Sequence, residues 1–127
     1  MYTNENSPLS AKSDAFSGRI IKMVLYLRKN KDAGLNSVYN QVLRSGTSIS
    51  ANIGESQFAQ STADFITKLH IALKEANETR KWLLMLKESE CLTCVQFESM
   101  NADLSEIIAI LVASINTAKR NQQIIVK

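Results

Sequence analysis

Two glutamates, Glu75 and Glu78, are the residues whose type and spacing come closest to an acid–base site. They lie three positions apart in a segment with helical periodicity. Paired carboxylates can act as general acid and base, but no histidine partner, metal-ligand pattern or substrate-pocket signature accompanies this pair. We therefore expect no enzymatic activity and interpret both carboxylates as structural. Arg44 and Asn52 are their candidate hydrogen-bonding partners on another helix.

His70 and the cysteines Cys91 and Cys94 are the other residues with chemistry suited to metal binding or redox work. A single C-x-x-C motif needs a βαβ context to be a redox motif and a second ligand pair to hold zinc, and this chain offers neither. We expect the cysteines in a turn between helices and His70 on a solvated face. The sequence thus predicts no cofactor, no metal site and no small-molecule substrate.

The composition is that of one mildly basic domain of 127 residues with a net charge of +3. A chain of this length can bury a core without disulfide or metal staples. No apolar stretch is long enough to span a membrane, and the first residues lack a secretory pattern, so no membrane partner and a cytoplasmic location are expected. The small positive excess permits contact with an acidic polymer without requiring it.

Four segments with apolar residues at intervals of three and four predict an all-α fold, an up-down-up-down four-helix bundle. Residues 1–12 show no such period, so we expect a flexible N-terminal lead there and a bundle domain over residues 13–127. The first helix is predicted to begin at Ser13 or Asp14, which suit an N-cap. Gly34 is the expected left-handed stop after it.

The second predicted helix contains an uncharged stretch of small residues, Ser45–Gly54, that leaves two interpretations open. Gly46 can end the helix and leave a serine-rich loop, because serine, threonine and glycine disfavour helix interiors. Alternatively the helix continues, and its small residues let neighbouring helices approach closely. The unbroken spacing from Val42 through Gly46 to Ile53 favours a continuous helix.

The third segment shows the clearest helical pattern. A capping box formed by Ser61 and Asp64 predicts its start, and we expect it to end near Ser89. Its apolar seam alternates steps of four and three. The seam consists of Phe65, Leu69, Ala72, Ala76, Thr79, Leu83 and Leu86. A fourth helix follows and is expected to fray toward Lys127.

Three residues of the third segment, Ile71, Trp82 and Met85, are apolar but lie outside this seam. A bundle has one inside, and residues left apolar on a second face usually mark a partner surface. These residues are therefore the candidate contacts between copies of the chain. The alternative is that Trp82 packs beside the core within one chain.

Basic residues are spread over every predicted helix, and any one cluster taken alone is best explained as a solvated face. Self-association changes this view, because symmetry repeats a modest patch into an extended positive surface. The candidate nucleic-acid contacts are Arg28 and Lys29 on the first helix and Arg80 and Lys81 on the third. We expect only one of the two pairs to line such a shared surface.

A specific series of residues runs through the second and third segments, between about residues 38 and 92. The series is Arg44, Ser48-Ile49, Asn52-Ile53, Glu55, Ser61, Asp64-Phe65, Ile71-Ala72, Glu75 and Glu78. In it the chain resembles the four-helix bundle family of 23S ribosomal RNA intervening-sequence proteins, which is related to the accessory variability determinants of diversity-generating retroelements. One departure is Gly54-Glu55-Ser56, where the commoner family form is Ala-Glu-Gly.

The resemblance implies a homopentamer, a barrel with a central channel, and no established enzymatic activity. The motif residues expected to form its polar network are Arg44, Asn52, Glu55, Glu75 and Glu78. The retroelement relatives bind nucleic acid and a reverse transcriptase through a basic surface, so RNA, DNA or such an enzyme are implied partners. Two functions stay open: a basic scaffold for nucleic acid or a nucleic-acid enzyme, and a purely structural or protein-interaction oligomer.

Overall fold

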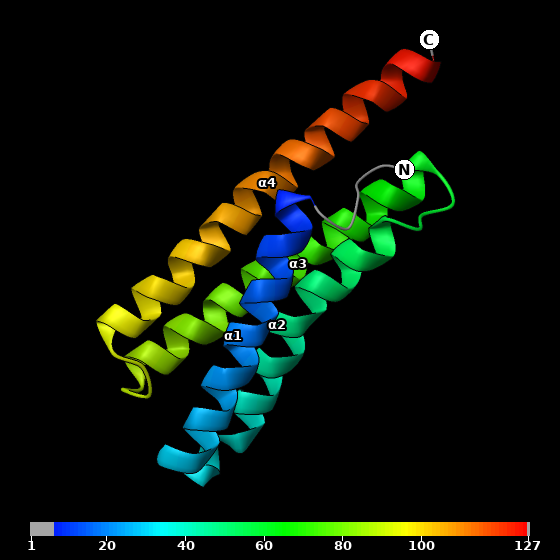
Figure 1. The fold of residues 1–127 in the computed structure, drawn as a ribbon. Helices are drawn as coiled ribbons and strands as arrows, with labels where there is room; N and C mark the ends of the chain where they lie inside the picture. The colour runs from blue at the N-terminus through cyan, green and yellow to red at the C-terminus, as the bar shows by residue number, and fades with distance from the viewer. Residues whose placement is uncertain (1–6, 127) are drawn as a thin grey trace.

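Four long helices and one short 3₁₀ turn make up the computed structural model, which describes residues 7–126 (Figure 1). No strand occurs among these residues, so the predicted all-α class is confirmed. None of the described helices is both long and apolar enough to cross a membrane. The elements are α1 (Pro8–Asn30), η1 (Ala33–Leu35), α2 (Asn36–Ser56), α3 (Thr62–Glu88) and α4 (Cys94–Val126).

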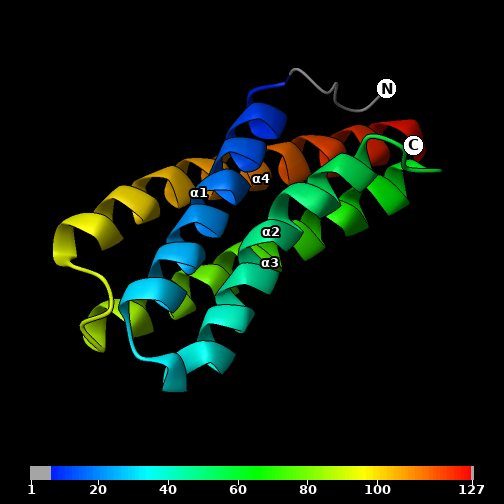
Figure 2. The same ribbon diagram turned by 60° about the horizontal axis from the view of Figure 1, so that its bottom comes forward.

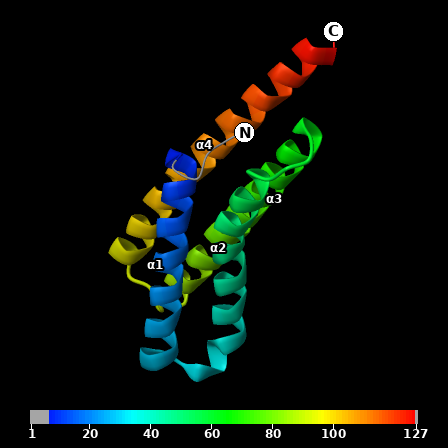
Figure 3. The ribbon, with the colours of Figure 1, turned by 45° about the vertical axis from the view of Figure 1, so that its right-hand side comes forward.

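Each helix packs against its neighbour in the chain, and α4 also packs against α1 (Figures 1 and 2). The four helices therefore surround one interior, and each contributes one apolar stripe to it. α4 is the longest helix, and its C-terminal turns continue past the other helices (Figure 3). On the surface of the bundle, α1 and α4 meet along one seam between helices, and α2 and α3 meet along another.

The first helix begins earlier than its sequence pattern suggested. Ser7 is the N-cap, and its side chain accepts a hydrogen bond from the backbone N of Ser10 at 3.1 Å. Pro8 occupies the first helical turn, where a missing N–H costs nothing. Leu9 is buried, one heptad before Phe16. The expected flexible lead is therefore wrong for residues 7–12, and residues 1–6 lie outside the described residues.

The end of α1 also differs from the prediction. The helix stops at Asn30, and Lys31 is extended with φ of −123°. No described glycine has a positive φ, so Gly34 is not a left-handed stop. It lies instead in the 3₁₀ turn, where its N–H donates to the Asp32 side chain at 2.7 Å. An aspartate-capped turn thus reverses the chain where a glycine C-cap was expected.

α2 is continuous through Ser45–Gly54, which settles the two interpretations in favour of a single helix. Its hydroxyl side chains donate to carbonyls one turn back in the same helix, as Ser48 does to Arg44 O at 2.7 Å. Gly46 lies against α1, because a Cβ placed there would be 2.8 Å from Ile20 Cγ1. Gly54 has no atom within 4 Å of such a Cβ. The close approach of α2 to α1 therefore requires glycine at position 46 but not at position 54.

The predicted seam of α3 is buried along its whole length. Ser61 caps the helix and accepts from the backbone N of Asp64 at 3.1 Å, as predicted. The return bond of the capping box is displaced, since Asp64 accepts from the N of Gln60. Within the core, the hydroxyls of Thr79 and Ser45 are hydrogen-bonded at 2.9 Å, which joins α3 to α2. A buried polar pair of this kind favours one register of the two helices.

Candidate functional site

Arg44, Glu75 and Glu78 meet on the seam between α2 and α3. The guanidinium of Arg44 is 3.3 Å from Glu75 Oε2 and 2.6 Å from Glu78 Oε1. The Glu75 side chain is 15% exposed, whereas those of Glu78 and Arg44 are 33% and 48% exposed. The Arg44 guanidinium therefore forms ion pairs with both carboxylates, and its contact with the more buried one, Glu75, is the longer. This triad ties α2 to α3 through charge-assisted hydrogen bonds.

The two carboxyl groups differ in pKa because their surroundings differ. Burial raises the pKa of Glu75, and the neighbouring Glu78 raises it further. The hydrogen bond from Arg44 lowers the pKa of Glu78. The Trp82 indole acts in the same direction on Glu78, although its buried Nε1 makes no hydrogen bond of normal geometry in the described chain. Glu75 is thus the carboxyl of the pair that protonates first as the pH falls.

A shallow groove of about 530 Å³ runs beside this triad and is edged by Lys74, Asn77 and Lys81. Its walls hold three cations, two carboxylates and an amide, so the groove is close to electrically balanced. Among residues 7–126, no group of three or more His, Cys, Asp or Glu side chains is placed to hold a metal ion. The charges of Arg44, Glu75 and Glu78 thus offset one another in part where α2 meets α3.

Asn52 and Glu55 lie on α2 but do not join the triad. Asn52 Nδ2 donates to the carbonyl of Ser48 at 2.8 Å, one turn back in its own helix. The hypothesis that Asn52 is a partner of the glutamates is therefore wrong, because two helical turns separate it from Arg44. Glu55 forms its own ion pair with Lys68 Nζ at 3.3 Å, near the turn between α2 and α3.

The three apolar candidates on α3 differ in exposure. Ile71 is 37% exposed and Met85 is 49% exposed, and both lie on the outer surface. Trp82 is half-buried and packs against the core. Trp82 thus packs within one chain, as the alternative interpretation had it. Ile71 and Met85 remain candidate contacts between copies of the chain.

The two candidate basic pairs are in different states. Arg80 Nε donates to Asn101 Oδ1 at 2.9 Å, and its Nη2 donates to Ser105 Oγ at 2.7 Å. Arg80 is therefore a half-buried link between α3 and α4. Arg28 instead binds the side-chain oxygens of Asn36 and Asn40 on α2 and stays exposed. Neither arginine has an acidic partner among the described residues. Arg28, Lys29 and Lys81 are exposed, and Arg80 alone of the four candidates is half-buried.

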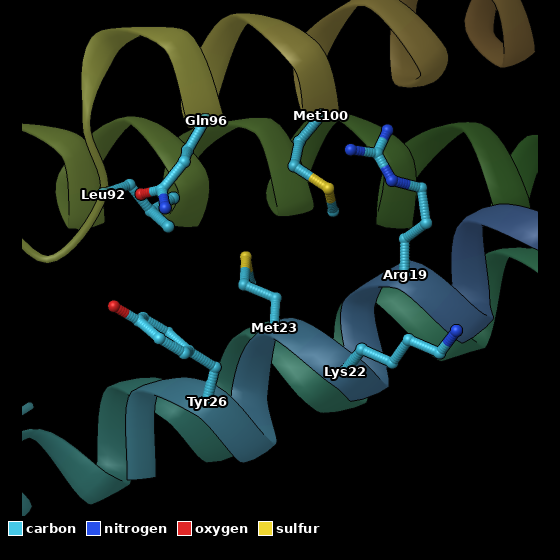
Figure 4. Close-up of a pocket in the computed structure, with 7 residues that line it drawn as sticks. All are labelled: Arg19, Lys22, Met23, Tyr26, Leu92, Gln96 and Met100. Atoms are coloured by element: carbon cyan, nitrogen blue, oxygen red, sulfur yellow. The ribbon is translucent and has the colours of Figure 1, made fainter. Parts of the chain in front are cut away.

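Sequence reasoning missed a groove of about 350 Å³ between α1 and α4 (Figure 4). Met23 and Tyr26 project from α1 toward Gln96 and Met100 of α4 (Figure 4). Its full lining is Arg19, Lys22, Met23, Tyr26, Leu92, Gln96 and Met100. Lys22, Tyr26 and Lys29 follow a four-and-three spacing that the sequence displays. The sequence offers no signal that Gln96 and Met100 lie opposite.

Ion pairs close the α1–α4 seam on one side of this groove. Arg19 is 2.6 Å from Asp103 Oδ2, and it also donates to Ser99 Oγ at 2.9 Å. Lys12 is 2.7 Å from Glu106 Oε2, further along the same seam. Asp103 and Glu106 are therefore neutralised by α1, and the groove itself is lined by no acidic side chain.

Comparisons with known proteins place the chain in a family. The family model described as 23S rRNA-intervening sequence protein matches residues 5–113. A crystal structure of a protein of unknown function, from the S23 ribosomal protein family of Bacteroides thetaiotaomicron VPI-5482, is 47% identical with a TM-score of 0.81. The match covers 84% of this chain and 97% of that one. A search of curated proteins found no match. This chain therefore belongs to the 23S rRNA-intervening sequence protein family.

Proposed function

We propose that this protein is a non-enzymatic, self-associating helical scaffold that binds nucleic acid through the unpaired cations of α1. The observation that supports the proposal is the distribution of charge. Residues 15–54 carry six basic residues and one acidic residue, Asp32. Residues 88–118 carry five acidic residues and no basic one. The modest net charge of +3 therefore conceals a strongly basic region.

Most of the cations in this basic region lack a neutralising partner. Arg19 pairs with Asp103, and Arg44 pairs with the two glutamates of α3. The other four have no ion-pair partner among residues 7–126. They are Lys22, Arg28, Lys29 and Lys31, all at the surface of α1 or in the turn that follows it. Such a patch, on binding phosphates, releases the counterions condensed on the nucleic acid, which gives affinity without sequence preference.

Self-association is the second part of the proposal. We propose an up-down-up-down bundle that assembles as a homopentamer, as the family resemblance implies. The short connections between consecutive helices support the topology. Exposed Ile71 and Met85 supply apolar surface for a contact between subunits. Five copies would repeat the basic region around a symmetry axis and multiply its attraction for a polyanion.

Two matched charge reversals test the nucleic-acid proposal. Lys22→Glu with Lys29→Glu alters the basic region, and Lys74→Glu with Lys81→Glu makes the same charge change at the same seven-residue spacing on α3. All four lysines are exposed and free of ion pairs in the described chain. We expect the α1 pair to lower affinity for a labelled oligonucleotide by about tenfold or more at low salt, and the α3 pair to have a much smaller effect.

The salt dependence supplies a second readout of the same experiment. Loss of two lysine–phosphate contacts to a single strand reduces the steepness of the plot of log affinity against log salt by about 1.4. Lys22→Gln with Lys29→Gln should show this reduction, and the Lys74 and Lys81 counterpart should not. Equal losses from both pairs contradict the assignment to α1. Absence of binding by the unmodified protein at low salt contradicts the proposal and leaves the purely structural oligomer.

A further inference from the structure

The groove between α1 and α4 combines a flat aromatic side chain with soft apolar walls. Tyr26 is 48% exposed, so one part of its ring is open to solvent. Met23 and Met100 lie on either side of the gap, one from each helix (Figure 4). Thioether side chains adapt their shape to a flat partner, and tyrosine offers a rigid stacking surface. The exposed amide of Gln96 adds an N–H donor at the α4 wall, while its Oε1 accepts from the backbone N of Thr93 at 2.9 Å.

Two free cations flank the aromatic ring along α1. Lys22 precedes Tyr26 by four residues and Lys29 follows it by three, so all three side chains share one face of the helix. The two lysines are separated by about 10 Å along the helix axis. Neither lysine has an ion pair in the described chain, and the acidic residues of the adjoining seam are already paired with Arg19 and Lys12. The arrangement is an aromatic platform between two available positive charges.

From this arrangement we infer that the α1–α4 groove receives an unpaired base of a single-stranded nucleic acid, which stacks on Tyr26 while Lys22 and Lys29 contact the flanking phosphates. The inference rests on the proposed function and adds a preference to it. Paired bases in a duplex stay stacked on one another and present phosphates only, so the groove is used by single strands alone. Any base can stack, hence no sequence preference is expected.

Substitution of the platform tests the inference directly. Tyr26→Leu removes the ring, whereas Tyr26→Phe keeps it and serves as the matched control. Leucine and phenylalanine are both compatible with a helix, and a melting curve checks that each variant stays folded. We expect Tyr26→Leu to weaken binding of oligothymidylate by about 5- to 150-fold, the effect of losing one stacked base. Tyr26→Phe should bind oligothymidylate as the unmodified protein does, and neither variant should change the affinity for a duplex.

An abasic oligomer with the same number of phosphates completes the design. The unmodified protein should bind it more weakly than oligothymidylate, and Tyr26→Leu should cause no further loss. If Tyr26→Leu leaves binding of oligothymidylate unchanged while Lys22→Gln with Lys29→Gln weakens it, the base site is refuted and the basic scaffold stands. If Tyr26→Leu weakens the abasic and the thymidylate oligomer alike, stacking is also refuted. No binding of any oligomer at low salt overturns both proposals.

Discussion

Gly46→Ala is expected to destabilise the protein, although alanine is the better helix former. The added Cβ would lie 2.8 Å from Ile20 Cγ1 and 2.9 Å from Ile20 Cγ2. These atoms belong to a fully buried, β-branched side chain that has little freedom to move aside. Overpacking of this kind costs about 1 to 3 kcal/mol. Higher helix propensity offsets about 1 kcal/mol of that cost, so we expect a net loss of about 1 kcal/mol.

Gly54→Ala is the matched control for this prediction. It makes the same change in the same helix, but no atom lies within 4 Å of the new Cβ. Only the helix propensity then acts, and the variant should gain up to about 1 kcal/mol in free energy of unfolding. Urea denaturation followed by circular dichroism measures both variants. Protein concentration must be held constant, because self-association makes apparent stability depend on concentration.

A double substitution tests whether Ile20 is the cause. Ile20→Ala removes the three atoms nearest to the new methyl group, at a cost of about 2 to 5 kcal/mol by itself. In that background, Gly46→Ala should become stabilising by about 1 kcal/mol, since the clash is gone and the helix propensity remains. Stabilisation by Gly46→Ala in the unmodified chain, equal to that of Gly54→Ala, would refute the close approach of α1 and α2.

Two further predictions concern the contact between α2 and α3 and the exposed face of α3. Arg44→Met removes the cation that lowers the pKa of Glu78. A lowered carboxyl pKa stabilises the fold above about pH 4.5, so the variant should be less stable than the unmodified protein by about 1 kcal/mol or less at pH 7. This difference in stability should shrink toward pH 4. Equal denaturation midpoint shifts at the two pH values would contradict that assignment. Ile71→Lys with Met85→Lys should lower the oligomer mass in light scattering without loss of helical circular dichroism, and an unchanged mass would place the subunit contact elsewhere.

Much of the fold follows from local pattern in the chain. The seam of α3 was predictable residue by residue, because a helix repeats its buried face every three or four positions whatever it packs against. The same regularity correctly indicated a continuous α2 despite its serines and glycines. The start of α1 was misjudged because the polar residues around Leu9 concealed an apolar stripe. Ser7 followed by Pro8 nevertheless matches the sequence pattern of a helix N-terminus.

The candidate site was predictable only where one residue has an obvious partner of opposite charge. The sequence predicts Arg44 as a partner of Glu75 and Glu78, and the three groups do meet. It predicts Asn52 as a second partner, but Asn52 bonds to its own helix. A wheel diagram shows the direction in which a side chain leaves its helix. It does not show how far along the helix axis a group on another helix lies. That distance explains why Arg44 reaches the glutamates and Asn52 does not.

The sequence by itself therefore determined the helices, their buried faces and the family of the protein. Tertiary structure alone decided which cations are neutralised. Arg19 is paired with Asp103 across the α1–α4 seam. Lys22 and Lys29 are left without ion-pair partners in the described chain. The physical reason is that neutralisation requires an opposite charge within about 4 Å. Helices far apart in sequence meet that condition only after the core has set their lateral position and their offset along the bundle.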